Sequence, residues 1–326
     1  MNAAITGVGY ALPDQVLTNA QLEQMVETDD AWIVQRTGIR ERRIAGPDIA
    51  TSDLASKAAE SAMTAAGVRA EDLDLIIVAT VTPDHAFPST ACLVQRNLGA
   101  WKAAAFDLEA ACTGFIYGLS VAEQFIRTGT YKHVLVIGAE TLSKITDYTD
   151  RNTCVLFGDG AGAAVLSAYE EQGLLALDIG ADGRGGELLV QQAGGSRKPA
   201  SPETLAAREH FIQMHGREVF KFAVRVLGET SERVLSAANV DSGEIDLLIP
   251  HQANLRIIDS ACKRLGIDRE KVFVNLDRYG NMSAASIPVA LAEAEAQGKL
   301  KKGDRILLVG FGGGLTWGSA LLNWVK

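Results

Sequence analysis

Two hydrophobic patterns alternate along the chain. Continuous apolar runs of strand length occupy residues 73–80, 133–139, 245–250 and 305–312. Runs of this kind predict strands that are buried on both faces of a sheet. Between them, apolar residues recur at helical spacing, most clearly over 52–67 and 216–238. Buried strands that alternate with amphipathic helices predict an α/β fold, whereas the polar, glycine-rich stretch 181–210 predicts a long loop.

The second part of the chain repeats the first. The first two apolar runs both recur 172 residues further on. The segment between them recurs at an offset of 168, which aligns Leu108 with Leu276 and places Cys112 beside Gly280 and Asn281. Internal duplication predicts two similar α/β halves stacked on each other, and we expect a site where they meet. The halves are an N-terminal one over 1–172 and a C-terminal one over 173–326.

Cys112 lies at a sharp junction between an apolar strand and an apolar helix. The segment 103–108 predicts a short buried strand, Gly114 allows a tight turn, and 115–129 recurs at helical spacing. The N–H groups and dipole at a helix N-terminus favour an anion, so the thiol can be held as the thiolate that attacks a carbonyl carbon. The position indicates a nucleophile, and the alternative is a small core residue.

His251 and Asn281 stand at two further junctions. His251 follows the apolar strand 245–250, at the kind of strand end where open α/β sheets bind ligands. Asn281 follows Gly280 at the second elbow. An imidazole and an amide can both donate hydrogen bonds to a developing oxyanion. The alternatives are a loop histidine and a turn or N-cap asparagine.

Composition and charge restrict the class of protein. The chain has 326 residues and a formal net charge of −9, which argues against a nucleic-acid partner. No apolar run approaches the ~20 residues that span a bilayer, and the N-terminus lacks a signal-peptide pattern, so we expect a soluble cytoplasmic protein with no membrane partner. The four cysteines form no CxxC and no Cys/His pair at ligand spacing, which predicts reduced thiols and no metal site.

Eight segments occur along the whole chain in a characteristic order: TDDAWIVQRTGIRERR, HAFPSTA, ACTGF, DRNTCVLFGDGAGAAVL, GREVFKFAV, PHQANLRII, GNMSAAS and GFGGGLTWGSAL. Together they resemble the 3-oxoacyl-acyl-carrier-protein synthase III family, the initiating condensing enzymes of fatty-acid synthesis. The resemblance implies a thiolase-like fold in which two duplicated halves form α-β-α-β-α layers. One residue departs from the family pattern: Met282 stands where the family usually has threonine, which puts the local packing in doubt.

The resemblance also implies a reaction. An acyl-CoA primer and malonyl-acyl carrier protein condense with release of CO₂ and coenzyme A, through an acyl-cysteine intermediate on Cys112. His251 and Asn281 are implied as the decarboxylation and condensation pair, and the backbone N–H groups of Cys112 and Gly313 as the oxyanion hole. The coenzyme A thioester is a substrate, so no further cofactor and no metal is expected. The length and branching of the primer stay open.

Further binding residues follow from the same resemblance. Trp32 and Arg151 are implied to stack on the adenine of coenzyme A, with Arg36 near its phosphates. Phe87 is implied to reach the acyl pocket of the partner in a homodimer.

A basic patch is expected to bind the acidic carrier protein. Lys221 and Arg225 are four residues apart on one predicted helix, and Arg256, Lys263 and Arg264 lie on the helix after His251. The alternative is that these side chains belong to ordinary solvated helix faces.

Other classes of protein fit the sequence less well. Chain-elongating synthases of this fold use two histidines and thiolases a second cysteine, but no histidine lies at the second elbow and Cys262 falls within a helix pattern. Gly158, Gly160 and Ala163 match the G-x-G-x-x-A pattern of dinucleotide-binding dehydrogenases, yet an apolar strand follows them in place of a helix. A non-catalytic acyl-binding or scaffold protein is the remaining alternative, and trapping of an acyl group on Cys112 distinguishes it.

Overall fold

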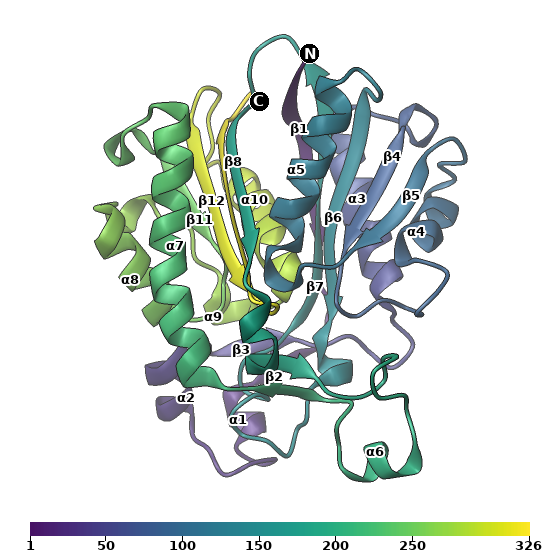
Figure 1. Ribbon diagram of the computed structural model, residues 1–326, viewed down its shortest axis with the longest axis vertical. Coiled ribbons are helices and arrows are strands. Elements are labelled where there is room, and N and C mark those ends of the chain that lie inside the picture. Colours follow the sequence, from purple (N-terminus) through teal and green to yellow (C-terminus); the bar gives the residue numbers. More distant parts are fainter.

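Two β-sheets lie between three layers of helices in the computed structural model, which describes residues 1–326 (Figure 1). The first sheet has five strands in the order β1-β7-β6-β4-β5. They span Asn2–Ala11 (β1), Asp159–Tyr169 (β7), His133–Thr141 (β6), Leu75–Ala79 (β4) and Ala104–Leu108 (β5). Strand β4 is parallel to both of its neighbours, whereas β7 is antiparallel to β1 and β6.

The second sheet has four strands in the order β11-β12-β13-β8. They span Leu247–Pro250 (β11), Arg305–Gly312 (β12), Thr316–Asn323 (β13) and Leu174–Ala181 (β8). Strand β11 is parallel to β12, and β13 is antiparallel to β12 and β8. The parallel pairs β4/β6 and β11/β12 therefore occupy corresponding places in the two sheets.

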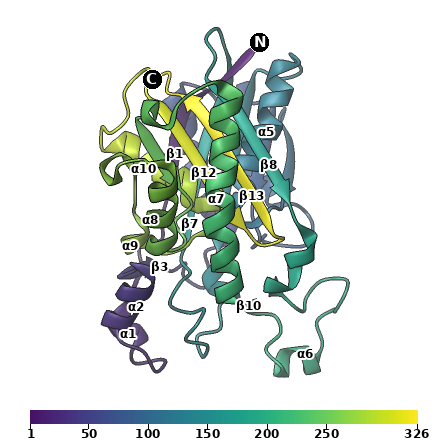
Figure 2. The same ribbon diagram turned by 60° about the vertical axis from the view of Figure 1, so that its left-hand side comes forward.

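Helices separate and cover the sheets. They are α5 (Gly114–Arg127) and α10 (Ser286–Ala296) between the sheets, α3 (Thr51–Ala66) and α4 (Thr90–Leu98) outside the first, and α7 (Gly216–Ala238) and α8 (Leu255–Leu265) outside the second. Figure 2 shows α7 lying across the second sheet. Every residue of α10 from Ser286 to Ala294 is buried, as expected for a helix with a sheet on either side. None of the helices combines the length and the apolar character needed to cross a membrane.

Shorter elements complete the chain. Those near the lower end of Figure 1 are β2 (Val16–Thr18), α1 (Asn19–Leu22), α2 (Asp30–Thr37), β3 (Glu41–Arg43) and α9 (Leu276–Tyr279). Single 3-10 turns are η1 (Ala70–Asp72), η2 (Ala111–Thr113), η3 (Leu142–Ile145), η4 (Gly183–Leu188), η5 (Ser242–Glu244), η6 (Arg269–Lys271) and η7 (Ser283–Ala285). The two that matter for the site are η2, which leads into α5, and η7, which leads into α10.

These two turns correct the alignment of the halves. Ala111 begins η2 and Ser283 begins η7, so the elbows correspond at an offset of 172 residues. The expected offset of 168, which placed Cys112 beside Gly280 and Asn281, is therefore wrong, and Cys112 corresponds to Ala284. The reason is α9, which stands in the second half where β5 runs on in the first and lengthens the path to the turn by four residues.

Two local expectations are also wrong. Strand β5 is not buried, because it is the edge strand of its sheet and pairs only with β4; the side chain of Phe106 is 36% exposed. The stretch 181–210 is not a loop throughout. It contains η4, β9 (Leu189–Gln191) and α6 (Pro202–Ala206), and β9 pairs with β10 (Ile212–Met214) to make a hairpin whose tip carries α6.

Candidate active site

Each elbow packs against the central strand of the opposite sheet. A Cβ atom added at Gly310 of β12 would lie 3.7 Å from the carbonyl oxygen of Cys112, and one at Gly312 would lie 2.7 Å from the Cys112 nitrogen. In the corresponding place of β6, a Cβ atom at Gly138 would collide with the carbonyl group of Ala284. Only glycine permits backbones to approach so closely. The two elbows therefore meet between the sheets.

Cys112 is held in a strained turn. Ala111, directly before it, has a left-handed φ of 46°, which costs a non-glycine residue about 1 kcal/mol. The thiol is buried, and this burial raises the pKa of Cys112 to about 12, although the nearby Ser283 hydroxyl acts to lower it. The positive end of α5 favours the thiolate, as the sequence indicates, but it has to act against desolvation.

His251 is buried and neutral at physiological pH. It follows β11, and its backbone N–H donates to the Val309 carbonyl oxygen at 2.7 Å. Burial lowers the pKa of its imidazole to about 3, and neither ring nitrogen has a hydrogen-bond partner within the protein. A Cβ atom at Gly310 would lie 3.5 Å from the His251 Cβ, so His251 and Cys112 flank this glycine. The ring can thus donate a hydrogen bond without carrying a charge.

The amide of Asn281 has a fixed orientation. Its backbone N–H donates to the Leu156 carbonyl oxygen at 2.8 Å, and its carbonyl oxygen accepts from the Gly158 N–H at 3.0 Å. Its side-chain Oδ1 accepts from the Ser283 N–H at 2.8 Å. Because the oxygen is engaged, the Nδ2 group is the donor that remains for a substrate.

Hydroxyl groups join the first elbow to the turn between β12 and β13. The Thr113 hydroxyl donates to the Thr316 hydroxyl at 2.9 Å, and the Thr316 hydroxyl reaches the carbonyl oxygens of Ala110 and Gly313, each at 3.1 Å. These bonds fix Gly313, one of the two expected oxyanion-hole residues, next to the turn that carries the thiol.

A cavity of about 610 Å³ leads to Cys112. Both halves line it, with Cys112 and Ser283 at one end and Gly313 beside them. Its apolar wall includes Val81, Leu142, Ile145, Phe157, Leu189 and Ile212. A concave, mainly apolar space that ends at a nucleophilic side chain suits the acyl part of a substrate.

Comparisons with known proteins agree with this arrangement. Residues 106–183 match the family described as 3-Oxoacyl-[acyl-carrier-protein (ACP)] synthase III, and residues 235–324 match its C-terminal part. The chain is 63% identical to beta-ketoacyl-[acyl-carrier-protein] synthase III of Natranaerobius thermophilus, over 99% of both chains. It is 58% identical to the Clostridioides difficile protein of the same name, over 99% of this chain and 98% of the relative. The chain belongs to the beta-ketoacyl-[acyl-carrier-protein] synthase III family.

Solved structures of the family share the fold. The crystal structure of 3-oxoacyl-[acyl-carrier-protein] synthase III from Aquifex aeolicus superposes with a TM-score of 0.92 at 50% identity, over 99% of this chain and 100% of the other. The Thermus thermophilus enzyme gives 0.92 at 47% identity, over 98% and 99%. The expected thiolase-like α/β fold is confirmed, and the protein is an acyl-transferring condensing enzyme of fatty-acid synthesis.

The residues expected to bind coenzyme A lie together. The guanidinium of Arg151 lies 4.6 Å from the centre of the Trp32 ring, and that of Arg36 lies 5.5 Å from it. Cation–π contacts of this kind hold two positive charges beside an aromatic surface. Phe87 lies elsewhere, on the segment after β4, and its side chain is 86% exposed. Its neighbours His85 and Ala86 line the cavity.

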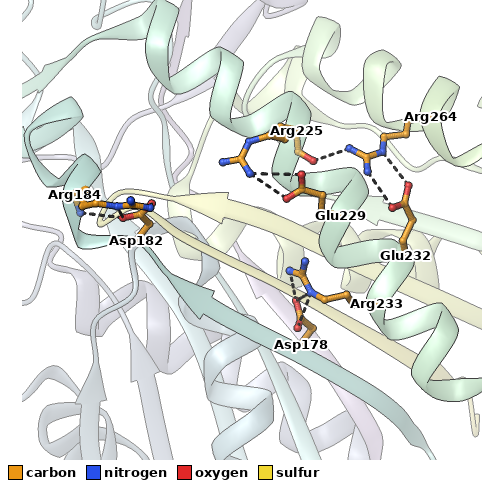
Figure 3. Close-up of polar contacts among 8 residues, drawn as sticks. All are labelled: Asp178, Asp182, Arg184, Arg225, Glu229, Glu232, Arg233 and Arg264. Atoms are coloured by element: carbon orange, nitrogen blue, oxygen red, sulfur yellow. Dashed lines mark hydrogen bonds and ion pairs between the residues drawn. The ribbon is translucent and has the colours of Figure 1, made fainter.

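Several basic residues expected to bind the carrier protein are already paired. Each has a carboxylate partner: Arg264 with Glu232, Arg225 with Glu229 and Lys221 with Glu218. Figure 3 shows the first two pairs and the bond from Arg264 to the Arg225 carbonyl oxygen. Arg256 and Lys263 are exposed and form no ion pair, and the Arg256 guanidinium lies 5.6 Å from the Phe220 ring centre. Two uncompensated cations therefore remain on this surface.

The dinucleotide-binding alternative does not fit the structure. Gly160 and Ala163 lie within β7, an antiparallel strand between β1 and β6, and the next element is another strand, β8. No helix N-terminus follows that could receive a pyrophosphate.

Met282 fills an apolar space. Its side chain is fully buried against Tyr279, Ala285 and Val289, and its backbone N–H donates to the Ser286 hydroxyl at 3.0 Å. The packing that the sequence left in doubt is therefore complete with methionine.

Sequence reasoning missed three polar residues beside the thiol: Glu140, Ser283 and Thr80. Glu140 ends the apolar run 133–139, and its charge at the end of a buried strand was the available signal. Ser283 lies in the segment GNMSAAS, two residues after Asn281. Thr80 ends another apolar run and, like Ser283, lines the cavity.

Proposed function

We propose that this enzyme condenses an acyl-CoA primer with malonyl-acyl carrier protein, giving 3-oxoacyl-acyl carrier protein, coenzyme A and CO₂. The observation that supports it best is the convergence of Cys112, the neutral His251 and the oriented Asn281 amide at the junction of the two sheets. The names of its relatives, beta-ketoacyl-[acyl-carrier-protein] synthase III, support the carrier-bound product.

In the first step Cys112 takes the acyl group. Its sulfur attacks the thioester carbonyl carbon of acyl-CoA, and the carbonyl oxygen becomes an oxyanion that the N–H groups of Cys112 and Gly313 stabilise. The C–S bond to coenzyme A then breaks, and the acyl group stays on Cys112. One thioester replaces another, so the step has little thermodynamic cost.

In the second step His251 and Asn281 act on the malonyl group. Loss of CO₂ from the malonyl thioester develops an enolate oxygen, and two neutral donors stabilise this negative charge. The enolate carbon attacks the acyl-Cys112 carbonyl, the new C–C bond forms, and Cys112 leaves as thiolate. Neutrality of the histidine, which burial enforces, prevents it from pairing tightly with the malonyl carboxylate that has to leave.

Coenzyme A and the second subunit complete the proposal. The adenine stacks between Trp32 and Arg151 and separates the two groups, while Arg36 contacts phosphate. The exposed edge of β5 and the exposed Phe87 support a homodimer, in which Phe87 of one protomer reaches the acyl cavity of the other. Carrier protein binds at the surface of α8 around Arg256.

A turnover panel tests the proposal and identifies the primer. The enzyme is incubated with malonyl-acyl carrier protein and acyl-CoA thioesters of increasing length and branching, and 3-oxoacyl-acyl carrier protein and CO₂ are measured. We expect equal amounts of both products with at least one primer. CO₂ release without any condensed product for every primer would contradict the proposal.

A further inference from the structure

Glu140 is a buried carboxylate that the proposed chemistry does not use. It lies near the end of β6, its side chain is fully buried, and it forms no ion pair with Lys or Arg. Its carboxylate accepts from the Thr82 hydroxyl at 2.6 Å, from the Thr80 hydroxyl at 3.2 Å and from the Val81 N–H at 3.2 Å. A carboxylate without a cation is costly to bury, so its presence calls for a reason beyond packing.

The duplication explains which way Glu140 points. Glu140 corresponds to Gly312 at the offset of 172, and Gly312 packs against the turn that carries Cys112. Glu140 faces the opposite turn, η7, in the same manner, and the Ala284 backbone and the Ser283 side chain there both act to lower the pKa of its carboxyl. The first half thus places a carboxylate where the second half has only a glycine.

Ser283 lies between this carboxylate and the thiol. Its hydroxyl acts on the pKa of both Cys112 and Glu140, yet it makes no hydrogen bond within the protein and is inaccessible to solvent. Buried hydroxyls almost always have a partner. A short rotation of the side chain can connect it to either group.

The thiol needs a proton acceptor. Burial disfavours the Cys112 thiolate, and the pKa of His251 is too low for it to hold a proton near neutral pH. Burial raises the pKa of Glu140 to about 7, which makes it the stronger base of the two.

We propose that Ser283 and Glu140 relay the proton that Cys112 loses when it is acylated. This rests on the proposed acyl transfer to Cys112. The thiol donates to the Ser283 oxygen while the Ser283 hydroxyl gives its proton to Glu140, so that a thiolate and a protonated carboxyl form. The sulfur attacks the acyl-CoA carbonyl, the bond to the coenzyme A sulfur breaks, and this sulfur takes a proton back through the same path. Glu140 acts through Ser283 and does not touch the substrate.

Few other titratable groups face this path. Glu109 and His251 are near Cys112, and the negative charge of Glu109, like that of Glu140, disfavours the thiolate. Asp159 of β7 lies on the neighbouring strand but bonds to Ser143 and to the Ala45 N–H. The pH dependence near 7 therefore belongs to Glu140.

The test is the single-turnover rate of acylation of Cys112 by acyl-CoA, followed as the mass of the Cys112 peptide between about pH 6 and 9. In the parent enzyme the rate rises through about pH 7 and then levels off. In Glu140→Gln we expect it to be about 10²-fold lower at neutral pH and to rise across the whole range, because only direct ionisation of the thiol remains. Ser283→Ala gives the same profile and removes no existing hydrogen bond. Glu123→Gln, on α5, is the matched control and keeps the parent profile.

Two controls separate the possible failures. Decarboxylation of malonyl carrier, measured in a Cys112→Ala background, stays unchanged by Glu140→Gln if the site is folded. An acylated parent whose Glu140→Gln and Ser283→Ala variants react as fast as the parent overturns the relay alone. Absence of acyl-Cys112 in the parent overturns the proposed function as well.

Discussion

Ala111 and Ser283 occupy equivalent positions in the two halves, 172 residues apart, with almost the same left-handed backbone, φ 46° and 45°. Each begins the 3-10 turn that leads into a central helix. The same strained elbow is therefore used twice. In the first half it presents the Cys112 thiol, and in the second half it follows the Asn281 amide and presents a hydroxyl.

Replacing Glu140 with glutamine changes how stability depends on pH. In the unfolded chain the carboxyl ionises near 4.5, whereas burial raises its pKa in the folded protein to about 7. As pH rises between these values, the unfolded chain loses its proton first, so the native state loses up to about 3 kcal/mol, and the loss is complete above about pH 7. Urea unfolding should show Glu140→Gln to be more stable than the parent at pH 8 and equally stable at pH 4. Equal stability at pH 8 would mean that Glu140 is not held protonated.

Met282→Thr should destabilise this protein even though the family usually has threonine there. The substitution removes buried apolar volume next to Tyr279 and Val289 and adds a hydroxyl to an apolar cluster. We expect a loss of about 2 kcal/mol in the free energy of unfolding. Met282→Leu, which nearly conserves volume, is the matched control and should lose less than about 1.5 kcal/mol. A threonine variant as stable as the parent would show that the cluster repacks.

Charge reversal at Arg256 should weaken use of the carrier protein. Arg256 is exposed and has no carboxylate partner, whereas Arg264 is bound to Glu232. We expect Arg256→Glu to lower kcat/KM for malonyl-acyl carrier protein roughly tenfold at low salt and to flatten its salt dependence, because exposed charges steer association. Acylation by acyl-CoA should stay near normal, and Lys57→Glu on α3 should affect neither. Equal losses in both half-reactions would contradict a role in carrier binding.

A charge on the edge strand β5 should dissociate the expected dimer. Phe106 is partly exposed on this strand, which pairs on one side only. A like charge repeated across a two-fold interface is unfavourable, and a charged residue blocks edge pairing. Sedimentation velocity should find a dimer for the parent, a monomer for Phe106→Asp, and a dimer for the control Met25→Asp, which changes another exposed apolar residue. A Phe106→Asp dimer would place the interface elsewhere.

The sequence predicted the features that depend on neighbouring residues. The apolar run 133–139 is a buried strand, and Cys112 lies at a strand-to-helix junction, because hydrophobic period and turn residues act locally. The alignment of the elbows failed because α9 shifts the register within the second half, and a sequence comparison of short segments cannot detect a shift that is later reversed.

Contacts between distant segments could not be predicted. The proximity of Ser283 to Cys112 and Glu140 depends on how closely the two elbows pack, which glycines such as Gly138 and Gly312 permit. Likewise, the pairing of Arg264 with Glu232 depends on how α8 crosses α7, so the charge that remains for a partner is visible only in three dimensions.

Acyl trapping in His251→Ala tests most directly the central claim, that the two halves perform separate chemical steps. The variant is incubated with acyl-CoA, the Cys112 peptide is weighed, and CO₂ release from malonyl-acyl carrier protein is measured in parallel with Cys112→Ala. We expect His251→Ala to gain one acyl group but to release CO₂ about 10²–10³-fold more slowly than the parent, because it lacks one oxyanion donor. Cys112→Ala should gain no acyl group and retain decarboxylation. A His251→Ala enzyme that cannot be acylated would contradict the claim, because His251 would then be the base that activates the thiol.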